Sequence, residues 1–146
     1  MAETLGSLVD KLTIKNIRLN NLRKEGRKSK KKINIVQSQR RDLIGEMNQF
    51  LAQALKEKVK LRDEKVKLYR QPKAEEKISR TLGALVDRLC QRNIQLWYLE
   101  DEARRSDVRD AYIGRIKRKI DITNQSRNDL IDRIDELLER KVKRSR

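Results

Sequence analysis

Residues 4–22 read TLGSLVDKLTIKNIRLNNL, and the same pattern returns 77 positions later as TLGALVDRLCQRNIQLWYL at residues 81–99. The chain therefore contains an internal duplication, in which each copy forms one supersecondary unit that packs against the other. Leucines recur at spacings of three and four, which predicts an amphipathic helix with a seam for a partner helix. The seam positions are Leu5, Leu8, Leu12, Leu19 and Leu22 in the first copy, and Leu82, Leu85, Leu89, Leu96 and Leu99 in the second.

The second segment of each copy repeats as well, at a different spacing. Residues 40–44 read RRDLI and residues 127–131 read RNDLI, an offset of 87 positions. The second copy therefore carries ten extra residues, around the stretch EDEARRSDVRDAYIG. Two amphipathic segments joined by a turn favour an antiparallel hairpin of helices. The sequence predicts an all-α fold of two tandem antiparallel αα-hairpins that form a four-helix bundle or a coiled-coil-like assembly.

Capping and breaking residues give the expected helix boundaries. Thr4 and Thr81 stand where an N-cap hydroxyl belongs, and Gly26 can adopt the left-handed conformation that ends a helix. The single proline, Pro72, is expected to end a second helix that extends beyond the bundle. The expected helices cover residues 4–24, 29–70, 80–104 and 109–142, with Ser106, Asp107 or Asp110 as candidate N-caps for the last. The expected domains are a first hairpin at 1–57, a helical extension and linker at 58–79, and a second hairpin with a basic tail at 80–146.

The composition indicates a thin core and a chain that stays in the cytoplasm. Hydrophobic residues make up 36% of the 146 residues and charged residues 41%, which is typical of long helices packed along narrow seams. No apolar run approaches the length of a membrane-spanning helix. The N-terminus has Glu3 and lacks the basic and apolar regions of a signal peptide. The single cysteine, Cys90, fits a reducing compartment and a small packing role.

Polar residues interrupt the leucine seam and are expected to face one another across each hairpin. A polar layer in an apolar seam costs stability but can fix the register of the helices. In the second copy, Asn93 on the first helix should meet Asn124 and Arg127 on the second, with Asp87 near Arg127. We expect this layer to be structural, because no catalytic element accompanies it. The predicted layer comprises Asn16, Asn93, Asn124, Arg127 and Asp87.

Two stretches of the second copy resemble a bacterial family of uncharacterised helical proteins. The stretches are LWYLEDEARR and IGRIKRKIDITNQSRNDLIDRIDELL, and the resemblance covers about residues 81–140. Tyr98 stands where that family often has histidine, and the first copy has Asn20 in place of Trp97. The resemblance implies an all-helical fold and supplies no established activity. It is carried by Trp97, Glu100, Asp101, Lys117, Arg118, Ile120, Asp121, Asn124, Gln125, Arg127, Asn128 and Asp129.

Enzymatic chemistry has little support in the residues. The chain has no histidine, which removes the commonest general base and the usual zinc ligand. Neither the Glu-x-x-His pairs of di-metal bundles nor a glycine-rich phosphate loop is present. The stretch RIDELLERK at residues 133–141 loosely resembles a helix of chorismate mutases, but its pattern arises readily in any amphipathic helix. We therefore expect no enzyme activity, no cofactor and no metal, with a chorismate mutase-like enzyme as a remote alternative.

Charge is the remaining functional signal, because the chain carries 38 basic and 22 acidic residues, a net charge of +16. Residues 1–60 hold fifteen basic against six acidic residues, a net of +9, so the first copy is the more basic half. Basic clusters attract phosphate backbones without reading sequence, and an anionic membrane surface would serve equally well. The structural alternative is a solvated helical face. The candidate phosphate-binding residues are Arg23, Lys24, Arg27, Lys28, Lys30, Lys31 and Lys32 at the first turn, and Arg140, Lys141, Lys143 and Arg144 in the tail.

Trp97 and Tyr98 are adjacent on the first helix of the second copy, so one of them must lie off the main seam. With a thin core, such an aromatic side chain can pack internally or contact a second chain. The sequence thus favours a non-enzymatic scaffold or assembly protein that associates with itself or with another helical protein. Non-specific nucleic-acid binding is the alternative.

Overall fold

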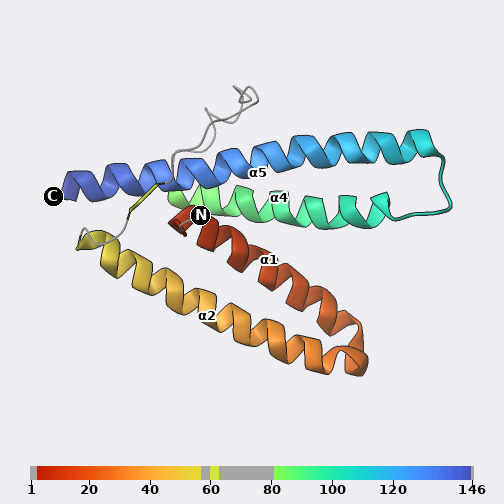
Figure 1. Ribbon diagram of the computed structural model, residues 1–146, viewed down its shortest axis with the longest axis horizontal. Helices are drawn as coiled ribbons and strands as arrows, with labels where there is room; N and C mark the ends of the chain where they lie inside the picture. The colour runs from red at the N-terminus through yellow and green to blue at the C-terminus, as the bar shows by residue number, and fades with distance from the viewer. Residues whose placement is uncertain (1–2, 57–59, 63–80, 146) are drawn as a thin grey trace.

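The computed structural model describes residues 3–56, 60–62 and 81–145, and its regular elements are all helical (Figure 1). The first hairpin consists of α1 (Leu5–Lys24), a short 3-10 turn η1 (Gly26–Ser29) and α2 (Lys30–Leu55). The second consists of α4 (Leu82–Ala103) and α5 (Asp110–Ser145). The helices of each hairpin run antiparallel, so the predicted all-α fold of two helical hairpins is confirmed.

The repeated threonines begin the repeated helices in the same way. The hydroxyl of Thr4 accepts a hydrogen bond from the Ser7 amide at 3.2 Å. Thr81 accepts one from the Ala84 amide at 3.3 Å. Each bond satisfies one of the amides that a helix start leaves without an intrahelical partner. At the other end of α1, Gly26 has φ 78°, the left-handed conformation that favours glycine.

The ten extra residues of the second copy mainly lengthen its helices. Asp110 begins α5, yet its counterpart in the first copy is Arg23, well before the start of α2 at Lys30. At the other side of the turn, α4 also ends slightly later than α1 does. None of the three proposed N-caps, Ser106, Asp107 and Asp110, occupies the cap position of α5. Asp110 already lies within the first turn of the helix, and the residue directly before it is Arg109. Asp107 instead pairs with Arg105 at 2.8 Å.

The second helix is shorter than predicted. It ends at Leu55 instead of reaching residue 70, and residues 60–62 have no helical structure. Leu61 is buried in the core, and Arg62 forms an ion pair with Glu136 of α5 at 2.7 Å. The sequence pattern of this segment favours a helix, but helix propensity is a weak preference that tertiary contacts can override. Here the burial of Leu61 and the ion pair of Arg62 favour a non-helical conformation at residues 60–62. Pro72 and residues 63–80 lie outside the described residues.

The core is one cluster that runs between α1, α4 and α5 and also includes Leu43, Phe50 and Ala54 of α2. Seam leucines of both copies are almost completely buried, together with aliphatic residues of α5; these are Leu8, Leu85, Leu89, Leu130 and Ile134. The α1 helix packs against all three other helices, and α4 packs along α5. Among the described residues, α2 packs extensively against α1 alone. Figure 1 accordingly shows α2 and the α4–α5 hairpin on opposite sides of α1. The bundle is open on the side of α2.

A glycine allows the start of α1 to lie directly on α5. A Cβ atom at Gly6 would stand 2.4 Å from the carbonyl oxygen of Ile131, a distance that no side chain tolerates. The amide of Gly6 donates a hydrogen bond to Oδ1 of Asp135 at 2.7 Å. Asp135, in the stretch that resembles a chorismate mutase helix, therefore binds the first turn of α1.

Candidate functional site

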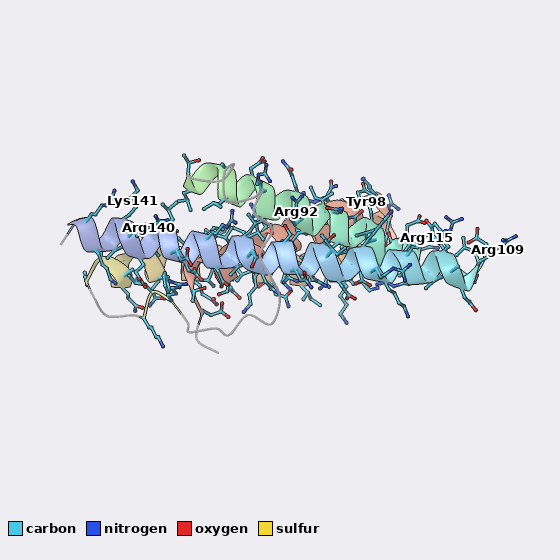
Figure 2. All side chains as sticks on the ribbon, turned by 90° about the horizontal axis from the view of Figure 1, so that it is seen from above. Arg92, Tyr98, Arg109, Arg115, Arg140 and Lys141 are labelled. Atoms are coloured by element: carbon cyan, nitrogen blue, oxygen red, sulfur yellow. The ribbon has the colours of Figure 1, made fainter. Side chains whose placement is uncertain are left out.

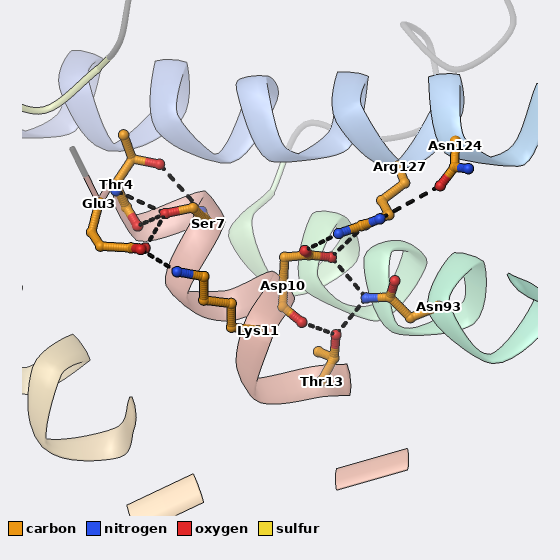
Figure 3. Close-up of polar contacts among 9 residues, drawn as sticks. All are labelled: Glu3, Thr4, Ser7, Asp10, Lys11, Thr13, Asn93, Asn124 and Arg127. Carbon is orange, nitrogen blue, oxygen red and sulfur yellow. Dashed lines mark hydrogen bonds and ion pairs between the residues drawn. The ribbon is translucent and has the colours of Figure 1, made fainter. Parts of the chain in front are cut away.

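A buried polar cluster connects the two hairpins at the centre of the molecule. Asp10 of α1 is 4% exposed and lies opposite Arg127 of α5 and Asn93 of α4 (Figure 3). Arg127 donates from Nε to Oδ1 of Asp10 at 2.9 Å and from Nη2 to Oδ2 at 2.6 Å. The side-chain amide of Asn93 donates to Oδ1 of Asp10 at 2.9 Å and to the hydroxyl of Thr13 at 2.6 Å. One carboxylate thus holds three helices together.

The chemistry of this cluster is that of a structural clamp. The planar guanidinium engages both carboxylate oxygens of Asp10, which is the strongest geometry for such a pair. The hydrogen bonds to Asp10 raise the pKa of Arg127, and burial opposes this shift. Asp10 accepts three hydrogen bonds in all, two from Arg127 and one from Asn93. The clamp fixes how the hairpins cross.

The predicted polar layer is only partly assembled. Asn93 and Arg127 meet, but through Asp10 rather than directly, and Asn124 lies 3.5 Å from Nη1 of Arg127. Asn16 is exposed and accepts a hydrogen bond from Arg40 at 2.8 Å, within the first hairpin. Asp87 does not bind Arg127: it is exposed and accepts from Gln91 one turn along α4.

The polar cluster also contains Asp10 and Thr13, which the predicted layer does not include. For Asp10, the internal repeat indicates a role in the cluster. Asp10 is the counterpart of Asp87, which was assigned to Arg127. A pair between Asp87 and Arg127 would lie within one hairpin, whereas the observed ion pair between Asp10 and Arg127 joins the two hairpins. Because Asp10 and Asp87 occupy equivalent positions of the repeat, each is a candidate partner for Arg127.

A groove between α1 and α4 forms an open apolar surface. Trp97 contributes to its wall, and Ile94 and Tyr98 beside it are 40% and 64% exposed. On its other side, Trp97 lines a cavity of about 400 Å³ between α1 and α2 that includes Leu22 and Ile35. The two aromatic residues of the predicted interface therefore adjoin solvent-accessible apolar surface. Cys90 lines the same groove and is a free thiol.

The basic side chains of the first turn form an exposed cluster around η1. All seven predicted residues are exposed, and the only acidic residue among them, Glu25, accepts a hydrogen bond from Ser29 at 2.6 Å. The second cluster, at the end of α5, is also exposed, and Lys143 there pairs with Glu139 at 3.3 Å. Figure 2 shows Arg140 and Lys141 at the opposite end of α5 from Arg109. The first turn and the tail lie far apart along the molecule (Figure 1), so they are two separate surfaces.

The described part of the chain holds neither a candidate metal site nor a candidate membrane-spanning helix. It contains no group of three or more acidic, cysteine or histidine side chains placed to hold a metal ion. None of its helices has the length and apolar character needed to cross a lipid bilayer.

Comparison with curated proteins and with solved structures found no significant match. Comparison with protein families did find a match. The matched residues coincide with the second hairpin, and the first hairpin is not matched. This supports the expected resemblance to an uncharacterised family at the level of the hairpin. The match begins at the second residue of α4 and includes all of α5. Residues 83–146 are similar to the family described as "Protein of unknown function (DUF4254)".

Proposed function

We propose that the protein is a cytoplasmic, non-enzymatic scaffold or assembly protein that acts through helix–helix association. The observation that supports this most is an exposed apolar stripe on α2. Ile44, Leu51 and Leu55 are 36%, 45% and 58% exposed, and their spacing of seven and four places them on one side of the helix. Among the described residues, α2 packs extensively against α1 and has a second apolar stripe that is exposed, so it is suited to receive another helix.

The groove beside Trp97 supplies a second apolar surface for such association. Tyr98 and Ile94 lie at its rim, and aromatic residues of this kind are enriched where protein surfaces meet. The buried clamp at Asp10 gives the association a fixed scaffold, because it holds α1, α4 and α5 in one orientation. The groove between α1 and α4 is therefore presented by a defined arrangement of helices.

Site-specific photocrosslinking tests this proposal. A photoreactive phenylalanine replaces Leu51 in the full chain, expressed in cells that naturally produce the protein. We expect one discrete crosslinked product of higher mass that disappears when unlabelled wild-type chain is added in excess. The matched control is the same probe at Asp42, which is exposed on the far side of α2 and should give no such product. Absence of a discrete product at Leu51 would exclude association through the stripe.

A second candidate function is non-specific binding to nucleic acid through the first turn. It is favoured by the seven exposed basic side chains between positions 23 and 32. The one acidic side chain in this stretch, Glu25, accepts a hydrogen bond from Ser29. Phosphate contacts of this kind release counterions, so affinity falls steeply as salt rises. A mobility-shift titration at several salt concentrations should show binding that is lost when Lys30, Lys31 and Lys32 are replaced by glutamine. Neutralising Lys141, Lys143 and Arg144 is the matched control. Binding unchanged by the first set would contradict this function.

A further inference from the structure

The contact between α1 and α5 has a set of counterpart residues in α4 and α2 that do not form the same contact with each other within one chain. On α1, the contact is made by Gly6, whose amide binds Asp135, and by Asp10, which binds Arg127. Leu5 beside them is 9% exposed. We call residues 5–10 the docking face, and Arg127, Ile131 and Asp135 the receiving stripe. Because the chain is duplicated, each surface has an equivalent in the other copy.

The equivalent docking face lies at the start of α4 and is open. Its residues 82–87 read LGALVD, against LGSLVD at 5–10. Leu82 is 46% exposed, and a Cβ atom at Gly83 would have no neighbour within 4 Å among the described residues. Asp87 is exposed and accepts a hydrogen bond from Gln91 of its own helix. Leu82, Gly83 and Asp87 thus reach solvent on α4, whereas Leu85 is buried in the core and Val86 is partly buried.

The equivalent receiving stripe lies on α2 and is largely open, although Arg40 is half-buried and donates a hydrogen bond to Asn16 of α1 at 2.8 Å. The offset of 87 positions places Arg40, Ile44 and Asn48 at the positions of Arg127, Ile131 and Asp135. Ile44 and Asn48 are exposed, whereas Ile131 and Asp135 are buried. The side-chain oxygen of Asn48 can accept an amide hydrogen as Asp135 does. The spacing of four residues gives both stripes the same geometry on their helices.

These two open surfaces do not pack on each other within one chain. Figure 1 shows α2 and α4 on opposite sides of α1, and they have no extensive packing among the described residues. Their chemistry is nevertheless complementary: a glycine allows close approach, apolar residues flank it, and Asp87 would meet Arg40 with opposite charge. A second copy of the chain supplies each surface with its counterpart.

We propose that two copies of this protein associate by docking residues 82–87 of one copy on the stripe Arg40, Ile44 and Asn48 of the other. This inference rests on the proposed function and names its partner. Each copy has one docking face and one receiving stripe, so a two-fold dimer makes the contact twice. Leu51 and Leu55 extend the apolar contact along α2. The net charge of +16 per chain opposes association, so salt should strengthen the dimer by screening the repulsion.

Sedimentation equilibrium of the full chain over a range of concentrations and salt tests the proposal. We expect a monomer–dimer equilibrium that Gly83→Ala weakens at least about tenfold, equivalent to about 1.4 kcal/mol. The added methyl group has free space in the single chain but would meet backbone in the docked pair, as it would at Gly6. Gly45→Ala is the matched control, since it also meets no atom within 4 Å and lies outside the stripe. It should leave the dimer unchanged.

A charge exchange tests the direction of docking. Asp87→Arg and Arg40→Asp should each weaken dimerisation, and mixing the two variant proteins should restore association, because the reversed charges then face each other across the pair. Circular dichroism of each variant checks that the helices persist. A wild-type chain that remains monomeric, or a dimer that Gly83→Ala and the charge variants leave intact, would overturn the proposal. If the chain is monomeric but Leu51 still crosslinks to a different protein, self-docking fails while the proposed function stands.

Discussion

Asp10 and Asp87 show how one residue type takes two roles in a duplicated chain. Both occupy the same position in the repeat, but Asp10 is buried against Arg127 and Asn93, whereas Asp87 is solvated. The sequence pattern identified the position and could not assign its partner. That choice depends on how the hairpins pack, since α1 lies in contact with α5 and α4 has no equivalent contact with α2.

Replacing Asp10 should therefore cost much more stability than replacing Asp87. Asp10→Asn removes the charge that pairs with Arg127 and should lower the free energy of unfolding by about 2 kcal/mol or more. Asp87→Asn at the exposed position should change it by less than about 0.5 kcal/mol. Urea denaturation in dilute protein measures both values. Equal effects of the two substitutions would show that Asp10 is not a clamp.

Gly6 is required by its contact rather than by its backbone conformation. Gly6→Ala inserts a methyl group 2.4 Å from the carbonyl oxygen of Ile131 and should destabilise the fold by about 1–3 kcal/mol, the usual cost of overpacking. Gly45→Ala, with open space around it, should stabilise α2 by up to about 1 kcal/mol, because alanine favours the helix. Thermal unfolding of the two variants beside wild type provides the comparison. A neutral Gly6→Ala would contradict the close approach.

At the scale of elements, the repeat predicted the four long helices of the described residues but not all of their ends. The capping threonines and Gly26 placed three boundaries within one or two residues, since these signals act locally. The end of α2 at Leu55 was missed because it depends on Leu61 and Arg62 reaching α5. The start of α5 at Asp110 lies one residue from the predicted start at 109. Its cap was predicted wrongly, because charged residues around the longer turn, such as Asp107 and Arg105, pair with one another.

The turn between α4 and α5 is held by an exposed cluster around Arg105. Arg105 forms ion pairs with Glu102 and Asp107 at 3.1 and 2.8 Å and lies 5.8 Å from the ring centroid of Tyr112. The Tyr112 hydroxyl donates to Glu102 at 2.5 Å. This hydrogen bond raises the pKa of Tyr112, and it lowers the pKa of Glu102 together with the bond from Arg105. The cluster closes the longer turn without a glycine.

A tyrosine titration measures this contact. Tyr112 should titrate above 10.0, its ordinary pKa, because ionisation would place two negative charges side by side. Its contribution to stability should be complete below pH 10 and should be lost as the pH rises through the higher pKa of the folded state. Carbon-13 NMR of labelled tyrosine follows the titration, with Tyr112→Phe to assign the signal. Glu102→Gln should move the pKa of Tyr112 back towards 10, and no change in that variant would refute the contact.

At the scale of the whole molecule, composition predicted a thin helical core, and the structure has one. What composition could not predict is the openness of the bundle, which leaves Ile44, Leu51 and Leu55 exposed on α2. The basic residues were correctly expected to reach solvent, but the structure separates them into surfaces at different ends of the molecule. A phosphate backbone long enough to reach both would have to extend along the molecule.

The attachment of α2 through α1 has a consequence for local unfolding. A helix with few neighbours can separate and exchange its amide hydrogens without melting the rest of the fold. In dilute protein, deuterium should therefore enter the middle of α2 much faster than residues 116–134 of α5. The protection of α2 should rise with protein concentration if a second copy covers its stripe. Equal protection of α2 and α5 in a monomer would mean that the hairpins unfold together as one cooperative unit.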